Sequence, residues 1–118
     1  MDDIILYVIN ATAYAIDPGA AAVGVGTVAI PLGPAPLAAG GHDLGLLLSD
    51  GNGDLNIAYT PSIADPVVDF GIQVTLDAGA NFHVVTDSSR PNVAGIDHVW
   101  APLVLHGQPV YAVVVRMG

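Results

Sequence analysis

The sequence contains no cysteine, no glutamate and no lysine, and each absence narrows what the protein can be. Without cysteine, neither a disulfide framework nor a thiolate metal site can form. Exposed helix faces are normally filled with Glu, Lys, Gln and Arg, which keep much of their rotamer freedom there, so this chain has little material for helices. It is instead rich in Val, Ile, Thr, Gly, Pro and Asp, which favour strands and turns.

Positive charge is also scarce. All eleven acidic residues are Asp, and Arg90 and Arg116 are the only Lys or Arg residues, which gives a net charge of −9. This balance argues against binding to nucleic acid, which needs clustered cations, and against binding to anionic membranes. The acidic start lacks the pattern of a secretory signal, and Pro and Gly interrupt the uncharged stretch 18–41. We therefore expect a soluble protein without a membrane span.

The length predicts a single domain, residues 1–118, and the residue pattern predicts the all-β class. The clearest strand is 70–76, in which Phe70, Ile72, Val74 and Leu76 alternate with more polar residues. Other strands are expected at 4–9, 11–16, 21–30 and 82–86, with one hairpin joining 44–48 to 55–59 and another joining 99–105 to 110–116. Short strands at such regular spacing predict an antiparallel β-sandwich of jelly-roll or Greek-key type, with a partly open barrel as the alternative.

Residues 31–41 (PLGPAPLAAGG) include three prolines, so they cannot pair as an interior strand. The segment predicts either a long surface loop or an extended arm with polyproline character. As an arm it would lie across a neighbouring molecule, since an already stiff chain loses little entropy on docking.

Two groups of residues are candidate binding sites. Asp50, Asn52 and Asp54 place oxygen-bearing side chains at alternate positions of a Gly-rich loop, as a calcium site requires. The loop resembles the start of an EF-hand loop, but Leu55 and Pro61 occupy the places of its glycine and its bidentate glutamate. The same residues also suit a plain hairpin turn, so both interpretations stay open.

The second group surrounds the single tryptophan. Trp100 follows Arg90, Asn92 and Asp97, and an aromatic ring beside amide, carboxylate and guanidinium groups suits a sugar or a peptide. The alternative is that Trp100 is a core aromatic residue.

Catalytic and cofactor motifs are absent from the sequence. Ser49, Ser88 and Ser89 are available for a Ser-His-Asp triad, but no Gly-x-Ser-x-Gly motif supports one. We therefore expect no enzyme activity and, apart from the calcium alternative, no cofactor.

Sparse charge carries the functional hypothesis. Eleven acids and two arginines on an expected surface of about 6,000 Å² leave much apolar area without ionic cover, so we expect other subunits to bury part of it. In this respect, and in its compact all-β character and Pro-rich segment, the chain resembles in general type the decoration or cement proteins of tailed-bacteriophage capsids. The resemblance implies a non-enzymatic protein of the virion surface, a homo-oligomer and above all a trimer, bound to the major capsid protein. The alternative is a carbohydrate- or receptor-binding β module, such as a fibre or lectin-like head.

Overall fold

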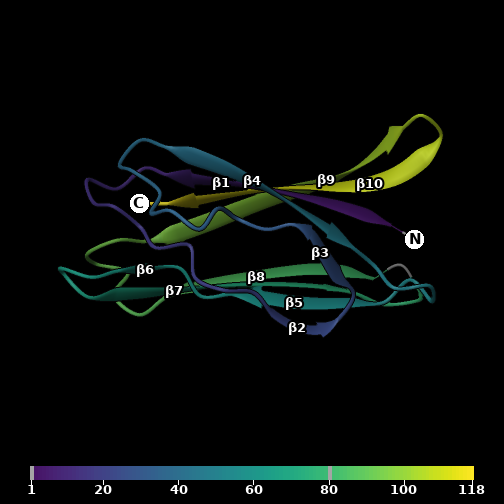
Figure 1. Ribbon diagram of the computed structural model, residues 1–118, viewed down its shortest axis with the longest axis horizontal. Coiled ribbons are helices and arrows are strands. Elements are labelled where there is room, and N and C mark those ends of the chain that lie inside the picture. Colours follow the sequence, from purple (N-terminus) through teal and green to yellow (C-terminus); the bar gives the residue numbers. More distant parts are fainter. Residues whose placement is uncertain (1, 80) are drawn as a thin grey trace.

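The computed structural model describes residues 2–79 and 81–118, and it consists of two β-sheets packed face to face (Figure 1). The first sheet contains, in order across it, β3 (Thr27–Ile30), β4 (His42–Leu48), β1 (Asp3–Asn10), β10 (Gln108–Met117) and β9 (Ile96–Leu105). The second contains β2 (Ala22–Val25), β5 (Leu55–Tyr59) and β7 (Val68–Leu76), with β6 (Ser62–Ile63) and β8 (Phe82–Ser88) both paired to β7. The predicted all-β sandwich is confirmed.

The pairing within the sheets is antiparallel with one exception. β1 and β10 run parallel in the middle of the first sheet, with Asp3 opposite Val110 and Asn10 opposite Met117. Parallel neighbours need a long connection, and here nearly the whole chain supplies it. The expectation of a purely antiparallel sandwich did not include this pair.

Inward-facing residues of both sheets fill the space between them. β7 alternates strictly between buried and more exposed residues, as its sequence predicts. β1 and β7 face each other across this space and contribute, among others, the core side chains Ile4, Leu6, Val8, Phe70, Ile72 and Val74. Each of these large side chains contributes about 1.5–3 kcal/mol when it leaves water, so the two strands hold the sheets together.

The single strand predicted over 21–30 is wrong, because the segment is divided between the two sheets. β2 pairs with β5 in the second sheet, whereas β3 pairs with β4 in the first. Gly26 lies between them with a φ of +97°, and a Cβ atom there would lie 2.8 Å from the carbonyl oxygen of Leu48. Only glycine fits this conformation and this close approach, so Gly26 marks the point where the chain changes sheets.

The predicted hairpin between 44–48 and 55–59 is also wrong. Both segments are strands, but β4 pairs with β1 and β3 while β5 pairs with β2 and β7. The glycine-rich loop 49–54 therefore crosses from one sheet to the other. Its turn residues fit both kinds of connection, so local sequence does not separate the two.

Residues 11–15 form no strand, contrary to the alternation in their sequence. The buried side chain of Asn10 accepts a hydrogen bond from the Thr12 N–H at 3.0 Å and donates one to the Tyr14 carbonyl at 2.7 Å. Such bonds from an Asn side chain to the nearby backbone compete with a strand ladder and favour a compact turn.

The Pro-rich segment 31–41 is a loop anchored on its own domain. Leu32 is buried, Leu37 packs against the core, and Leu37 exchanges two backbone hydrogen bonds with Ile16. Asn10 also donates to the carbonyls of Leu37 and Ala38. Of the two alternatives for this segment, these contacts favour the loop over the free arm.

Candidate interaction surface

The loop predicted as a calcium site is stabilised by its own carboxylates. Asp50 Oδ1 accepts hydrogen bonds from the backbone N–H groups of Asn52 and Asp54, both at 2.9 Å. Asp54 Oδ1 accepts one from Ala78 at 3.0 Å, which ties the loop to the end of β7. Across residues 2–79 and 81–118, no three His, Cys, Asp or Glu side chains converge as metal ligands. These hydrogen bonds show that the loop is a stable turn. Calcium binding stays a prediction.

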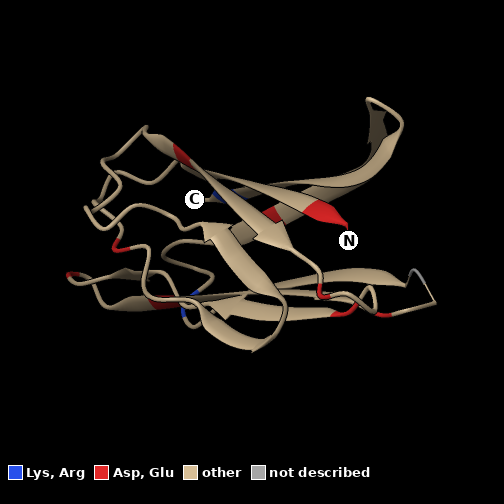
Figure 2. Cartoon of the chain, turned by 45° about the vertical axis from the view of Figure 1, so that its right-hand side comes forward, with Lys and Arg blue, Asp and Glu red and all other residues tan. Residues whose placement is uncertain are grey.

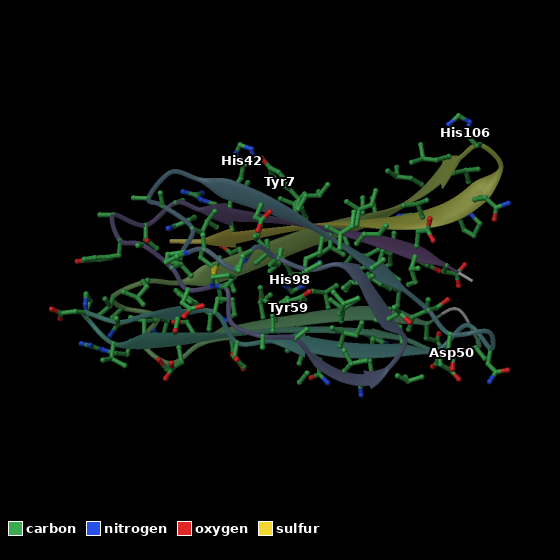
Figure 3. All side chains as sticks on the ribbon, in the orientation of Figure 1. Tyr7, His42, Asp50, Tyr59, His98 and His106 are labelled. Atoms are coloured by element: carbon green, nitrogen blue, oxygen red, sulfur yellow. The ribbon has the colours of Figure 1, made fainter. Side chains whose placement is uncertain are left out.

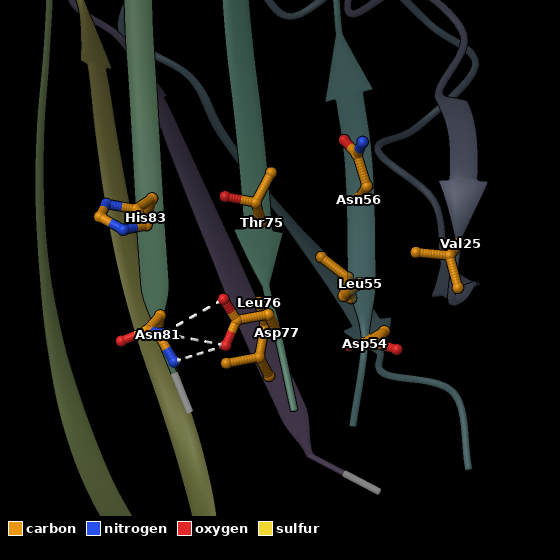
Figure 4. A pocket seen from close by; sticks show the side chains of 9 residues that line it. All are labelled: Val25, Asp54, Leu55, Asn56, Thr75, Leu76, Asp77, Asn81 and His83. Carbon is orange, nitrogen blue, oxygen red and sulfur yellow. Dashed lines mark hydrogen bonds between the residues drawn. The ribbon is translucent and has the colours of Figure 1, made fainter. Parts of the chain in front are cut away.

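An open hollow of about 460 Å³ lies beside this loop, at one end of the second sheet (Figure 4). Asp54, Thr75, Asp77, Asn81 and His83 are among the residues that line it. The Asn81 amide and backbone donate to the Asp77 carboxylate, and these bonds hold the pKa of Asp77 below its usual value. Figure 4 shows the Asn81 amide directed at Asp77. The polar groups of this hollow thus mainly stabilise the turn.

Of the residues predicted around Trp100, Asp97 does not share its side of the sheet. Trp100 points toward the second sheet, where its ring meets the edge of Phe82 at 4.7 Å between centroids, and Phe82 in turn stacks on Tyr111 at 4.4 Å. Asp97 lies three residues earlier in β9, so it points to the opposite side of the sheet. Arg90 and Asn92 are exposed in the loop before β9. Trp100 remains 40% exposed, so its ring is neither fully buried, as in a core residue, nor fully open, as in a binding platform.

The three serines considered for a triad each make a structural hydrogen bond. Ser49 is buried and accepts from the Asp2 backbone, Ser88 donates to the Ala94 carbonyl, and Ser89 accepts from the Asp69 backbone. His98 bonds to the Thr86 hydroxyl at 2.7 Å. These hydroxyls and this imidazole thus hold neighbouring segments of the sandwich together.

A much larger feature lies on the outer side of the first sheet. Residues that stand opposite one another in register form two apolar rows across it, and we call these rows the outer apolar face. One row consists of Leu44, Tyr7, Val114 and Val99. The adjacent row consists of Ile30, Leu46, Ile5, Ala112 and Ala101.

The outward direction of these residues follows from the burial of their neighbours. Along β1, Ile4, Leu6 and Val8 are fully buried, while the residues between them are only partly covered. Leu44 is 48% exposed and Val99 is 68% exposed. Figure 3 shows the labelled side chains of Tyr7 and His42 projecting from the upper side of this sheet, away from the second sheet. The first sheet is therefore apolar on both faces.

The second sheet has the opposite character on its outer side. There β7 presents Asp69, Gln73 and Thr75, and β5 presents Asn56, whose side-chain oxygen accepts a hydrogen bond from Gln73 at 3.3 Å. On β8, His83 and Asp87 point outward beside Val85. Polar side chains on such a surface form hydrogen bonds with water. A five-stranded apolar face is instead typical of a surface covered by another molecule.

Charged side chains lie at the margin of the outer apolar face. The next row of the sheet contains His42, Ile9, Arg116 and Asp97, and Asp3 bounds the other end. Arg116 and Asp97 stand directly opposite each other on β10 and β9. One of the two arginines of the chain thus stands in register with an aspartate at the edge of an uncharged surface.

The β9–β10 hairpin extends this surface beyond the body of the sandwich. The two strands predicted at 99–105 and 110–116 are confirmed, joined by His106 and Gly107, whose φ values are 52° and 77°. Two positive φ angles define the type I′ turn that matches the twist of a hairpin. In Figure 1 the hairpin curves away from the second sheet, and Figure 2 shows no charged residue on its projecting end.

The sequence carried one signal for this face. Residues 4–9 (IILYVI), 44–48 (LGLLL) and 110–115 (VYAVVV) are apolar without the alternation seen at 70–76. Such continuous runs are typical of strands that are buried on both sides. The sequence alone suggested a buried first strand but not that all three runs lie side by side.

No family model matches the chain, and no curated protein matches its sequence. None of the described segments is a helix able to cross a membrane. Among solved structures, the chain is similar to the crystal structure of the lipid binding protein Nakanori, with a TM-score of 0.72 and 10% sequence identity. The match covers 96% of this chain and 70% of the other. At this identity the likeness shows a shared β-sandwich fold.

Proposed function

We propose that the protein is a non-enzymatic structural protein that works by self-association, with its outer apolar face buried against other copies of itself. The observation that carries this proposal is the contrast between the two sheets, one apolar and one polar on its outer side. A free monomer would leave the apolar rows in water, which is unfavourable by about 25 cal/mol for each Å².

The size of the face suits an interface between copies. The whole outer side of the first sheet, which includes the outer apolar face and its margin, has five strands about 4.8 Å apart and on average about 25 Å long, and so a footprint of roughly 600 Å². Two copies packed through it would bury roughly 1,200 Å², which reaches the lower end of specific protein interfaces. The face is therefore large enough for a stable contact, and any further contact would strengthen it.

The absence of charge from the two apolar rows limits the repulsion between copies. At a net charge of −9, copies repel one another overall, and these rows provide a contact without like charges at close range. In a two-fold arrangement, Asp97 of one copy can face Arg116 of the other, so the margin of the face is complementary to itself.

The setting we propose is the surface of a virus particle, where the protein would decorate or cement a capsid by contacts with itself and with the major capsid protein. Repeated weak contacts over a lattice give avidity beyond that of any single contact. The polar second sheet, with Asp69 and Asp87 pointing outward, suits the side that faces solvent.

Light scattering of the purified protein, followed by co-sedimentation with capsids, tests both levels of this proposal. We expect an oligomer at micromolar concentration and pelleting with particles that lack their own decoration protein. A protein that stays monomeric up to millimolar concentration would contradict self-association. An oligomer that ignores every capsid would leave self-association standing and remove the virus setting.

Binding to a neutral lipid surface is a second candidate, and the apolar hairpin is the observation that favours it. The structural neighbour is called a lipid binding protein, and here an uncharged stretch runs from Val99 to Val115 with Trp100 near its base. Flotation with phosphatidylcholine vesicles tests this candidate. Binding by a monomeric protein would favour it, and an unbound oligomer would remove it.

A further inference from the structure

We infer that the tip of the β9–β10 hairpin is a second contact for another copy of this chain, separate from the outer apolar face, so that each copy binds more than one neighbour. This inference rests on the proposed self-association and adds to it the route to an assembly larger than a dimer. The tip is the stretch from Pro102 to Pro109.

The tip leaves the support of the sheet. β1 begins at Asp3, opposite Val110, so the residues nearer the turn pair only with each other. A two-stranded ribbon is at best marginally stable alone in water, and further strands or a packing partner normally stabilise it. The tip thus lacks the third strand that supports β10 from Val110 onward.

The tip is apolar on both sides. On the outer side, Leu103 and Leu105 are 44% and 47% exposed, in line with the outer apolar face. On the reverse side, Pro102 and Val104 point the other way, and Val104 is 73% exposed. Packing two copies through the outer apolar face would cover the leucines but not Val104. The reverse side therefore needs a different neighbour.

The open edges of the tip are short of hydrogen-bond donors. Leu105 and Gln108 face each other across the two-residue turn, and alternation along an antiparallel ladder then directs the backbones of Pro102 and Val104 to the open edge of β9. The same alternation directs Pro109 away from β9. Both prolines lack an N–H group, so the edges add few unsatisfied donors when the tip is buried, and they do not favour strand addition.

The end of the tip distinguishes a protein partner from a lipid. His106 and Gln108 are polar and exposed at the turn, so they would enter a bilayer first and deepest. The carbonyl groups along the open edges would also lose water without gaining partners in hydrocarbon. A neighbouring copy can cover the apolar sides and leave the polar turn in water. Such a contact joins unlike surfaces, and its repetition closes a ring, such as a trimer, or extends a lattice.

Sedimentation velocity of Val104→Asp tests the inference. Val85→Asp is the matched control, because Val85 is also an exposed β-strand valine (57%) but lies on the polar outer side of the second sheet. We expect the wild type and Val85→Asp to form assemblies larger than a dimer, and Val104→Asp to stop at the dimer. Assembly beyond the dimer should need about 100-fold more protein or higher, since an unpaired carboxylate is costly to bury. Unchanged circular dichroism spectra and melting temperatures would show that the variants fold.

The outcomes separate this inference from the proposed function. A wild type that is larger than a dimer, with Val104→Asp of the same size, would overturn the inference alone, as would a wild type that stops at the dimer. A wild type that is monomeric throughout would overturn both. Vesicle binding by the monomer that is lost in Val104→Asp would assign the tip to lipid and overturn the second-copy contact.

Discussion

Leu44→Asp is the substitution that most directly tests the outer apolar face. Leu44 is 48% exposed, so about half of its side chain is still available for burial, which is about 1 kcal/mol per copy. An aspartate in its place would also bring an unpaired carboxylate into the contact, at a further cost of about 3 kcal/mol. The sum of about 4 kcal/mol per copy predicts an association weakened by at least about 1,000-fold.

Sedimentation equilibrium over a wide concentration range measures this change. We expect Leu44→Asp to be monomeric where the wild type is associated, and Val85→Asp to behave like the wild type, because Val85 lies on the polar side of the sandwich. Since Leu44 is exposed in the monomer, the melting temperature of the dilute variant should change little. Equal association constants for the wild type and Leu44→Asp would show that copies do not bind through the outer apolar face.

Three further predictions concern the fold. Gly26→Ala should destabilise the protein by about 3 kcal/mol in urea unfolding and Gly40→Ala by only about 1 kcal/mol, because both have positive φ but only Gly26 also abuts a carbonyl oxygen. Tyr59→Phe should change stability by less than about 1 kcal/mol, since the buried hydroxyl makes no hydrogen bond of good geometry within the described part of the chain, although the Leu32 backbone lies close to it. Burial raises the Tyr59 pKa more than the Leu32 backbone lowers it, so ultraviolet titration should show one tyrosine ionising late, and stability should be lost as pH rises past the usual Tyr pKa. Hydrogen bonds from Asn81 lower the pKa of the Asp77 carboxyl group. The stability that they add is therefore present at pH values above the usual Asp pKa and is lost as pH falls through the pKa of the folded state. NMR titration of Asn81→Ala should show a higher Asp77 pKa.

Local alternation predicted the elements whose fate is decided locally. The strand at 70–76 and the strand that follows it pair as neighbours in the second sheet, with Phe70 opposite Ser88. The final hairpin is also local, because a two-residue turn fixes its register. In these cases the period of the apolar residues and the turn residues predict the same element, and the structure contains it.

Segments that change sheets could not be placed in this way. The stretch 21–30 alternates like one strand, and only its contact with the distant Leu48 shows why it divides at Gly26. The residues after β1 also alternate, but buried Asn10 holds their backbone in a turn. In both cases a tertiary contact overrides a local preference, and a single sequence does not reveal that contact.

The candidate interaction surface was foreseen in kind but not in place. Few charges predicted that part of the exterior would need cover, and the three continuous apolar runs lie where that exterior is found. Their assembly into one face depends on the parallel pairing of β1 with β10, which joins the two ends of the chain. No local pattern predicts that pairing. The residues that were chosen individually, Asp50 and Trp100, instead lie in a turn and in an aromatic cluster.

If another copy covers the outer apolar face, thiol reactivity measures this cover directly. The chain has no cysteine, so Leu44→Cys and Val85→Cys each introduce a single reporter. We expect the Leu44→Cys thiol to react ever more slowly with a thiol reagent as protein concentration rises, and the Val85→Cys thiol to react at a constant rate. Equal and constant rates at both positions, from micromolar to millimolar protein, would contradict this expectation.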